Sequence, residues 1–263
     1  MLENEYATMR AAEDSHWWYR GLHDQVRRAV KSCREDAGRP LRILDAGCGT
    51  GKVAALLAAD GHAVTGIDLA ATALALARER GDFALAQASA TALPFAEAAF
   101  DVALSLDVLP NIPPAAVPQA LADCRRTLVP GGWFICNVAA FQALYSEHDR
   151  AVGIVQRYTR GLLARLLDNA GFVSKRLTYA NTTLFPAAAL MRLWRKRPRP
   201  GRTPRSDLAL PPVAVNAALS GIRKLENILT MDFGLPLPVG LSIFAVARAP
   251  RRTPPRPNRQ PRT

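Results

Sequence analysis

A glycine-rich turn between two apolar runs is the feature that most constrains this fold. Residues 43–70 read ILDAGCGTGKVAALLAADGHAVTGIDLA, with glycines at positions 47, 49 and 51. The first apolar run reaches the turn through Asp45, and the second ends on Asp68. Glycine adopts backbone dihedrals that other residues avoid, so such a turn lets backbone amides and a helix N-terminus approach a ligand closely. The segment predicts a strand, a ligand-binding turn, a helix and a second strand.

Apolar runs and helix-like segments alternate along most of the chain. Runs typical of strands lie at 42–47, 62–68, 83–88, 100–106, 131–138, 172–179 and 239–248. Segments with helical spacing lie before or between them, at 17–37, 52–60, 70–81, 114–128 and 159–171. Strands that alternate with helices of roughly 10–15 residues form a parallel sheet covered on both faces. We therefore expect an α/β protein whose glycine turn lies at the carboxyl end of the first strand, where open parallel sheets bind ligands.

Two common nucleotide-binding patterns do not fit this turn. A dinucleotide-binding fingerprint needs G-x-G-x-x-G, but Lys52 stands where its third glycine belongs. A P-loop needs G-x-x-x-x-G-K-[ST], but Ala46 replaces its first glycine and Val53 its hydroxyl residue. What remains is the pattern D-x-G-x-G-x-G over 45–51, with Asp68 closing the second strand.

Four motifs in order make the chain resemble a known family. The four motifs together span roughly 40–138. In order they are LDAGCGTG, VTGIDLA with its acid, LPFAEAAFDVALSLDVL and LVPGGWFICNV. They are similar to motifs of the class I S-adenosylmethionine-dependent methyltransferases, in the broad group often called methyltransferase type 11. The resemblance implies a Rossmann-like α/β fold. Its seven-stranded, mostly parallel sheet would carry helices on both faces, with the last strand inserted antiparallel beside the fifth. It also implies S-adenosylmethionine as cofactor and S-adenosylhomocysteine as product.

The resemblance assigns cofactor contacts to the turn and to the next strand ends. Asp68 would accept hydrogen bonds from both ribose hydroxyls, as an acid does at this point of dinucleotide-binding folds. Leu69 would lie against the adenine, and the loop at 88–90 would contact its edge. The family often has an acid where Ser89 stands, and serine accepts more weakly. The expected cofactor-binding residues are Asp45, Gly47, Cys48, Gly49, Gly51, Asp68, Leu69, Ser89, Ala90, Leu106, Tyr19 and Arg20.

The segment EDSHWWYRG at 13–21 resembles an N-terminal segment of a set of bacterial methyltransferases. In such proteins the N-terminal helix commonly covers the cofactor site. We therefore expect the two tryptophans, Tyr19 and Arg20 to line the pocket, with Arg20 paired to the cofactor carboxylate. The aromatic residues could instead only anchor the helix to the sheet. For either tryptophan alone this second interpretation is favoured.

A second segment with the same resemblance, LYSEHDRAVGIVQRYTRGLL, follows the fifth strand on the substrate side of the sheet. Its polar groups nearest the acceptor would be His148, Asp149, Arg157 and Tyr158. Methyl transfer from a sulfonium is an in-line displacement, so the protein mainly aligns the nucleophile and excludes water. A base is needed only for a hydroxyl or an acidic C–H group, and His148 is the best candidate by intrinsic pKa. A lone histidine is more often a structural hydrogen-bonding group; even so, His148 and Tyr158 are the predicted catalytic residues.

Asp107 and Asn111, just past the fourth strand, also face the cleft by their position. The family often reads DVLEHI where this chain reads DVLPNI, so the usual acid–histidine pair is missing. No catalytic role is therefore predicted for Pro110 or Asn111. The four cysteines lack metal-site spacing, so no metal is expected.

Positive charge is concentrated in the last third of the chain. Residues 1–180 hold 19 basic and 19 acidic side chains, whereas 181–263 hold 15 and 3, which accounts for the formal net charge of +12. Within 184–205, an apolar helix-like run becomes basic at Arg192, Arg195, Lys196 and Arg197. Such a segment could contact a membrane surface or an acidic, lipid-linked substrate. A substrate lid with a solvated basic loop is the preferred alternative.

These patterns divide the chain into five expected segments. They are an N-terminal helical lid at 1–40, a cofactor-binding core at 41–180, a helical basic insertion near the substrate side at 181–238, the last core strand at 239–248 and a disordered proline- and arginine-rich tail at 249–263. The N-terminus lacks an apolar signal, and the longest apolar runs are shorter than the roughly 20 residues that a spanning helix needs. The cysteines are typical of free thiols in a reducing compartment. A cytoplasmic location is expected, with 184–205 as a candidate contact with the inner membrane surface.

The predicted function is methyl transfer to a small-molecule acceptor, such as a glycan, a lipid-linked molecule or a secondary metabolite. Oxygen is slightly favoured over nitrogen or carbon as the receiving atom. A nucleic-acid methyltransferase that uses the basic third, and a non-catalytic binding protein on the same fold, are the alternatives. Amino-methylating DNA enzymes carry an (N/D)PPY-like box after the fourth strand, but this chain reads SLDV there. No sequence-specific nucleic-acid partner is therefore expected, and no oligomeric state is predicted.

Overall fold

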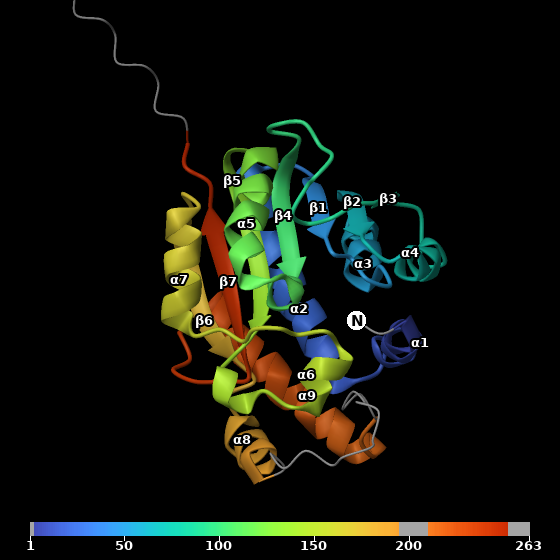
Figure 1. The fold of residues 1–263 in the computed structure, drawn as a ribbon, viewed down its shortest axis with the longest axis vertical. Coiled ribbons are helices and arrows are strands. Elements are labelled where there is room, and N and C mark those ends of the chain that lie inside the picture. The colour runs from blue at the N-terminus through green and yellow to red at the C-terminus, as the bar shows by residue number, and fades with distance from the viewer. Residues whose placement is uncertain (1–2, 195–209, 252–263) are drawn as a thin grey trace, which may run out of the picture.

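The computed structural model describes residues 3–194 and 210–251, which build a seven-stranded sheet (Figure 1). The strand order is β3-β2-β1-β4-β5-β7-β6, and neighbours run parallel except for β7, which is antiparallel to both β5 and β6. The strands are β1 (Arg42–Ala46), β2 (Ala63–Asp68), β3 (Ala84–Gln87), β4 (Phe100–Leu106), β5 (Leu128–Ala139), β6 (Val173–Ala180) and β7 (Ser242–Arg248). The predicted Rossmann-like α/β sheet with an antiparallel last strand is confirmed.

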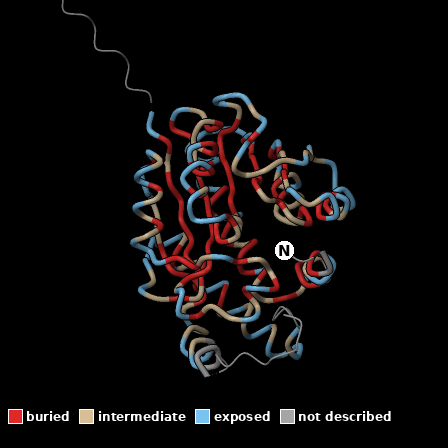
Figure 2. The backbone as a smooth tube through the Cα atoms, in the orientation of Figure 1, coloured by how far each residue is buried: buried red, intermediate tan, exposed pale blue. Residues whose placement is uncertain are grey.

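Helices cover both faces of this sheet. The covering helices are α2 (Trp17–Ala37), α3 (Lys52–Ala59), α4 (Ala71–Arg78), α5 (Val117–Thr127) and α7 (Arg160–Asn169). On one face, Leu121 of α5 and Leu163 of α7 belong to the same buried cluster as Phe134 of β5. On the other face, Val26 of α2 belongs to the same cluster as Ile135. The central strands are buried on both sides, which is why their sequences are continuous apolar runs (Figure 2).

The N-terminal segment divides into two helices with different positions. α2 begins after His16, whose Nδ1 accepts a hydrogen bond from the Trp18 amide at 3.2 Å, and ends where Gly38 adopts a left-handed φ of 67°. Because its apolar side packs on the sheet, α2 is a core helix. α1 (Glu3–Ala12) lies instead beside α4 (Figure 1). Its residues Tyr6 and Met9 line the cavity described below. Within 1–40, the position expected of a lid therefore belongs to α1 and the connector at 13–16.

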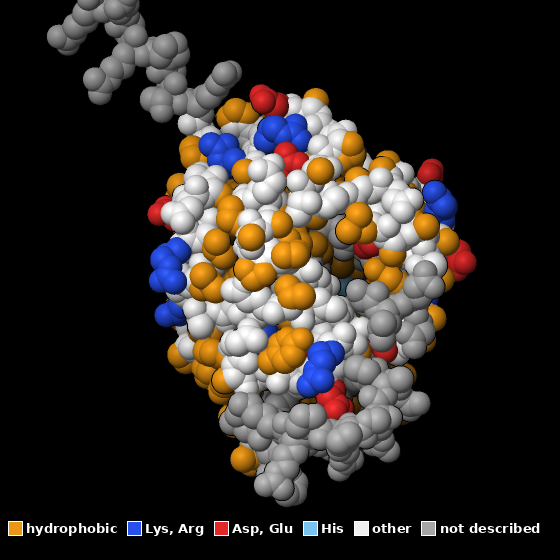
Figure 3. All heavy atoms as spheres, in the orientation of Figure 1, with side chains coloured by type: hydrophobic (Ala, Val, Ile, Leu, Met, Phe, Trp, Pro, Cys, Tyr) orange, Lys and Arg blue, Asp and Glu red, His pale blue; other side chains and the backbone are white. Residues whose placement is uncertain are grey.

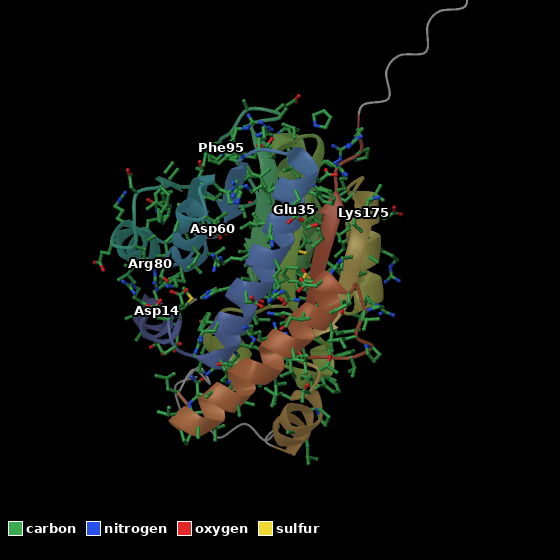
Figure 4. The ribbon with its side chains drawn as sticks, turned by 180° about the vertical axis from the view of Figure 1, so that it is seen from behind. Asp14, Glu35, Asp60, Arg80, Phe95 and Lys175 are labelled. Atoms are coloured by element: carbon green, nitrogen blue, oxygen red, sulfur yellow. The ribbon has the colours of Figure 1, made fainter. Side chains whose placement is uncertain are left out.

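The chain between β6 and β7 adds a helical layer behind the sheet. It contains α8 (Phe185–Trp194), α9 (Val213–Asn227) and the π-helical turn η4 (Ile228–Asp232). α9 packs along α2, and the two helices are seen together from behind in Figure 4. The short elements before β6 are η1 (Leu109–Asn111), η2 (Pro114–Ala116), η3 (Gln142–Leu144) and α6 (Glu147–Ala151).

The contact between α2 and α9 is polar. The side chain of Arg223 donates to Glu226 and to Gln25, each at 3.0 Å, and all three residues are buried. Asn227 donates to the carbonyl of Gly21 at 2.8 Å. A Cβ on Gly21 would lie 2.8 Å from Nε of Arg223, so the close approach of the two helices requires glycine there. Paired polar groups thus anchor the insertion to the core.

Part of the basic insertion lies outside the described residues. Within the insertion, the side chain of Arg192 and residues 195–209 are not described, and most of the predicted basic cluster lies there. Most of the predicted tail, at 252–263, also lies outside the described residues. None of the helices in the described ranges has the length and apolar character needed to cross a membrane. The four cysteines are buried free thiols.

Candidate active site

A cavity of about 750 Å³ lies at the carboxyl edge of the parallel strands, beside the glycine turn. The ends of β1, β2, β3 and β4 line one side of it, and α1, the connector at 13–16, the first turns of α2 and α6 line the other. Figure 3 shows this hollow in the molecular surface, with hydrophobic side chains around its opening. This is the edge at which open parallel sheets bind ligands.

The glycine turn is fixed to the end of β2. The amides of Gly47 and Cys48 both donate to the carbonyl of Ile67 at 2.8 Å. Gly47 has a left-handed φ of 92°, and a Cβ there would lie 2.3 Å from Cγ2 of Val108. Only glycine therefore brings the backbone this close to the chain that follows β4.

Asp68 is oriented by two backbone amides at the wall of the cavity. Its Oδ2 accepts from the Gly49 amide at 3.0 Å, and its Oδ1 accepts from the Ala70 amide at 3.0 Å. The two carboxylate oxygens together can accept about four hydrogen bonds, so acceptor capacity remains beyond these two amides. The Tyr6 hydroxyl of α1 lies beside this carboxylate, and burial together with the charge of Asp68 raises the pKa of Tyr6 to about 12. The carboxylate thus stands between the glycine turn and α1.

Asp45 forms an acidic floor beneath the turn. Its Oδ1 is buried and has no hydrogen-bond partner among the described residues. Burial, followed by the charges of Asp68 and Glu13, raises the pKa of Asp45 to about 7. A buried acceptor without a partner is costly, so this oxygen fits a ligand that brings a cationic donor such as an ammonium group.

Acids dominate the charged lining of the cavity. The acidic lining residues are Glu13, Asp45, Asp68 and Asp107. Among the described lining residues, Arg157 is the one lysine or arginine, and its charge is paired with Asp149 at 2.7 Å. This lining attracts a ligand that carries positive charge and repels the pyrophosphate of a dinucleotide. The residues present therefore fit S-adenosylmethionine, which carries a sulfonium and an ammonium group.

Ten of the twelve predicted cofactor-binding residues line the cavity. They are Asp45, Gly47, Cys48, Gly49, Asp68, Leu69, Ser89, Ala90, Leu106 and Tyr19. Gly51 does not, because it turns toward α4: a Cβ there would lie 2.8 Å from Cβ of Ala77. Arg20 is exposed and is not among the lining residues, which corrects the expectation that it lines the pocket. Both predicted tryptophans do line it.

Ion pairs hold the connector at 13–16 against the glycine turn. Arg80, which follows α4, contacts the Glu13 carboxylate at 2.5 Å and donates to the Thr50 carbonyl at 2.9 Å. Asp14 pairs with both Lys52 and Arg80, and Figure 4 shows Asp14 and Arg80 close together. The side chains of Arg80 and Glu13 are only 5% and 7% exposed. The roof of the cavity is thus tied to its floor by a largely dehydrated ion pair.

We expect Arg80→Ala to lower the free energy of unfolding by about 3–5 kcal/mol, because it leaves the buried Glu13 carboxylate without its partner. Arg78→Ala, at the exposed last residue of α4 just before Arg80, is the matched control and should change stability by less than about 0.5 kcal/mol. Urea unfolding measures both, and adding Glu13→Gln to Arg80→Ala should recover part of the loss. Equal stabilities for the two arginine variants would contradict the role of this ion pair.

The acceptor end of the cavity contains only some of the predicted polar groups. His148 on α6, Asp107 and Asn111 line it, as does Arg157. Tyr158 does not: its side chain is fully buried, and its hydroxyl donates to the Leu109 carbonyl at 3.1 Å. The prediction of Tyr158 as a catalytic residue is corrected accordingly, because its hydroxyl holds η1 to β5. The described residues contain no group of three or more His, Cys, Asp or Glu side chains that could hold a metal ion.

Several residues of the N-terminal segment line the cavity although the sequence analysis did not predict them. Tyr6, Met9, His16 and His23 all line the cavity. Tyr6, Met9 and Glu13 follow one another at i, i+3 and i+7, the spacing of one helical face, and this signal could have identified them. Burial lowers the pKa of His23 to about 4, so that it is neutral at physiological pH.

Comparisons with known proteins agree with this geometry. Residues 44–136 match the family model described as a methyltransferase domain. A ubiquinone biosynthesis O-methyltransferase of Paracidovorax citrulli is 41% identical over 131 residues, which cover 45% of this chain and 54% of the relative. A ubiquinone/menaquinone biosynthesis C-methyltransferase of Methylobacterium nodulans is 35% identical over 188 residues, which cover 58% of this chain and 74% of the relative.

A solved structure shares the fold. It is a SAM-dependent methyltransferase of Methanosarcina mazei, with a TM-score of 0.51, 18% identity and coverage of 81% of this chain and 93% of that chain. The chain spans about half the length of the ubiquinone O-methyltransferases that it matches. Three observations indicate the same family. They are the ordered motifs, the strand order and a relative that is 35% identical and covered over 74% of its length. The chain therefore belongs to the class I S-adenosylmethionine-dependent methyltransferases.

Proposed function

We propose that this protein transfers a methyl group from S-adenosylmethionine to a small-molecule acceptor, with oxygen favoured over nitrogen or carbon. The observation that carries the proposal is a single cavity with two unlike ends. The glycine turn, Asp45 and Asp68 form one end, which suits a nucleoside with positive charge. Aromatic and aliphatic side chains form most of the other, together with Asp107 and His148. That end suits a largely apolar acceptor with one polar reacting group.

The residues of this chain would hold the cofactor as follows. Asp68 would accept from both ribose hydroxyls, and the free Oδ1 of Asp45 would accept from the ammonium group. Leu69, which is 67% exposed, and Ser89 would contact the adenine. When bound, the cofactor supplies a methyl group already activated on its sulfonium sulfur, so the protein need not activate the donor.

The aromatic residues of the connector and of α2 would exclude water from the acceptor. His16, Trp17 and Trp18 line the cavity beside Ile112 and Ile154. An acceptor enclosed by these side chains loses its hydration shell and much of its orientational freedom. Alignment of this kind is the main contribution that a protein makes to an in-line displacement. His148 remains a candidate base, and an acceptor that ionises easily needs less help from one.

The relatives are consistent with a small acceptor, since their names describe O- and C-methylation in ubiquinone and menaquinone biosynthesis. The acidic lining argues against a polyphosphate chain entering the cavity. We further propose a cytoplasmic enzyme that contacts the inner membrane surface through 184–205. The support is the apolar helix α8, where Leu190 is 72% exposed, and the basic residues that follow in the sequence.

The test is acceptor-dependent formation of S-adenosylhomocysteine by the full chain. S-adenosylmethionine with a labelled methyl group is incubated with small phenols, amines and acids with activated C–H groups, and separately with duplex DNA and tRNA. We expect label in a hydroxylated small molecule, identified as a methoxy group by NMR. Label only in nucleic acid, or tight cofactor binding without turnover on any acceptor, would contradict the proposal.

A further inference from the structure

Asp107 has a left-handed backbone conformation, which is uncommon in residues other than glycine. It follows β4 with a left-handed φ of 57°, and its side chain lines the acceptor end of the cavity. A residue other than glycine in this region is strained by about 1–3 kcal/mol, and such strain persists where the surroundings enforce it. Residues of this kind cluster at active sites, so the observed strain is a reason to ask what Asp107 does.

Asn137 of the neighbouring strand β5 holds Asp107 at two points. The Asp107 amide donates to the Asn137 carbonyl at 2.9 Å. The Asn137 Nδ2 donates to the two carboxylate oxygens of Asp107 at 2.9 and 3.0 Å. Asn137 itself is buried, with 2% of its surface exposed. The pair fixes the direction of the carboxylate and leaves it further lone pairs.

A second polar atom at this end has no partner. The Oδ1 of Asn111, one turn beyond Asp107, is buried without a hydrogen bond among the described residues, and Asn111 also lines the cavity. The oriented carboxylate of Asp107 and the unpartnered amide oxygen of Asn111 both accept hydrogen bonds. They suit a substrate that presents hydroxyl hydrogens in an otherwise apolar pocket.

We propose that Asp107, oriented by Asn137, takes the proton of the acceptor's hydroxyl group during methyl transfer. The O–H bond breaks and its proton goes to a carboxylate oxygen of Asp107. The freed oxygen electron pair forms the bond to the methyl carbon, and the electron pair of the carbon–sulfur bond returns to sulfur. This step deepens the function proposed above and rests on it. It makes Asp107, rather than His148, the catalytic base.

The surroundings of Asp107 are consistent with this task. Burial raises its pKa to about 7, against the hydrogen bond from Asn137 and the charge of Arg157, which both lower it. Tyr19 of α2 and Cys136 of β5 also interact with this carboxylate, and His148 of α6 lines the same cavity. A base with a pKa near neutrality is effective toward a weakly acidic hydroxyl, such as that of a phenol or an enol, and far less so toward an aliphatic alcohol.

The test measures proton uptake directly and needs no turnover. The probe is 4-nitrocatechol, a phenol that is already ionised in water at pH 8, titrated into the full chain saturated with S-adenosylhomocysteine. An aryloxide bound beside the Asp107 carboxylate would place two negative charges side by side. Binding would therefore take up one proton from solution, which the two groups would share. Calorimetry in buffers of different ionisation enthalpy counts this proton. We expect about one proton per bound probe for the native chain.

Four variants distinguish the carboxylate from its neighbours. Asp107→Asn keeps the shape of the side chain and should bring the uptake close to zero. His148→Gln should leave it at about one, as should Asp168→Asn, a matched loss of charge at an exposed site on α7. Asn137→Ala removes a hydrogen bond that lowers the pKa of Asp107. Asp107 should then already hold its proton at pH 8, so less proton is taken up when the probe binds; at higher pH the uptake should return. This variant provides the test if Asp107→Asn fails to fold.

The outcomes separate this inference from the proposed function. Uptake that persists in Asp107→Asn, or that disappears in His148→Gln instead, would overturn the role of Asp107. Failure of the native complex to bind millimolar 4-nitrocatechol would overturn the assignment of a weakly acidic hydroxyl. In each of these cases, retained binding of S-adenosylhomocysteine leaves the methyltransferase proposal intact. Loss of that binding in the native chain would instead count against the proposed function itself.

Discussion

Asp68→Ala should weaken the binding of S-adenosylmethionine by about 100-fold or more. The carboxylate would accept from two ribose hydroxyls, and a hydrogen bond to a charged group contributes about 1.5–3 kcal/mol. Two such bonds correspond to roughly two to four powers of ten in affinity. The substitution also leaves the Gly49 and Ala70 amides without their acceptor, which loosens the turn. Isothermal titration calorimetry with the purified variant measures the effect.

Asp82→Ala is the matched control for this experiment. Asp82 is an exposed carboxylate between α4 and β3, so its removal changes the net charge equally without touching the cavity. Its affinity for S-adenosylmethionine should stay within about threefold of the native value, as expected for a screened surface charge. An Asp68→Ala variant that binds as tightly as this control would remove Asp68 from the cofactor site.

Cofactor affinity should rise by up to about tenfold per pH unit between pH 5 and 7 and then level off. The reason is the pKa of Asp45, which burial and then the charges of Asp68 and Glu13 raise to about 7. Below that pH the carboxyl holds a proton and offers no charge to the ammonium group of the ligand. Binding must then release the proton, so titrations in two buffers should show about one proton released at pH 6 and few at pH 8.

The same carboxyl should act with opposite sign on the unliganded protein. Its native pKa lies above its ordinary value of 3.8, so the native state holds the proton between about pH 4 and 7. The stability contributed by this group is therefore present at low pH and is lost as the pH rises through 7. Asp45→Asn, which mimics the protonated form, should flatten both pH dependences. Unchanged pH profiles in Asp45→Asn would show that another group carries the linked proton.

The fold and most of the cofactor end could be predicted because both follow from local sequence. Strand-like and helix-like segments that alternate along the chain predict the parallel sheet. A glycine turn between β1 and α3 must then lie at the carboxyl edge of the strands. The predicted ligand contacts Asp45 and Asp68 lie at strand ends, where their direction depends neither on the phase of a helix nor on a distant partner. Ten of the twelve predicted residues accordingly line the cavity.

The errors concern side chains whose direction depends on helix phase or distant contacts. Tyr19 and Arg20 are adjacent on α2, and successive residues of a helix point about 100° apart, so only Tyr19 faces the cavity. Tyr158 follows α6, near the acceptor end in sequence. A bridge to Ala140 and a hydrogen bond to Leu109 turn it into the core. No local sequence pattern predicts either contact.

The α9 helix shows a further limit of periodicity. The insertion at 181–238 is predicted to be helical, and within it Ile222 and Leu225 of α9 lie at helical spacing. The most buried side chains of α9 are nevertheless Arg223, Glu226 and Asn227. Leu225 is 58% exposed. Polar partners on α2 make this orientation favourable, and partners some 200 residues away in sequence are not visible in the pattern of α9 itself.

The glycine turn and its acids are expected to bind S-adenosylmethionine. Calorimetric titration of the native full chain with S-adenosylmethionine, S-adenosylhomocysteine and NAD at pH 7.5 tests it most directly. Micromolar binding of the first two ligands, with no detectable binding of NAD, is the predicted result, because the acidic lining admits a cation and repels a pyrophosphate. Binding of NAD, or of none of the three, would contradict the account.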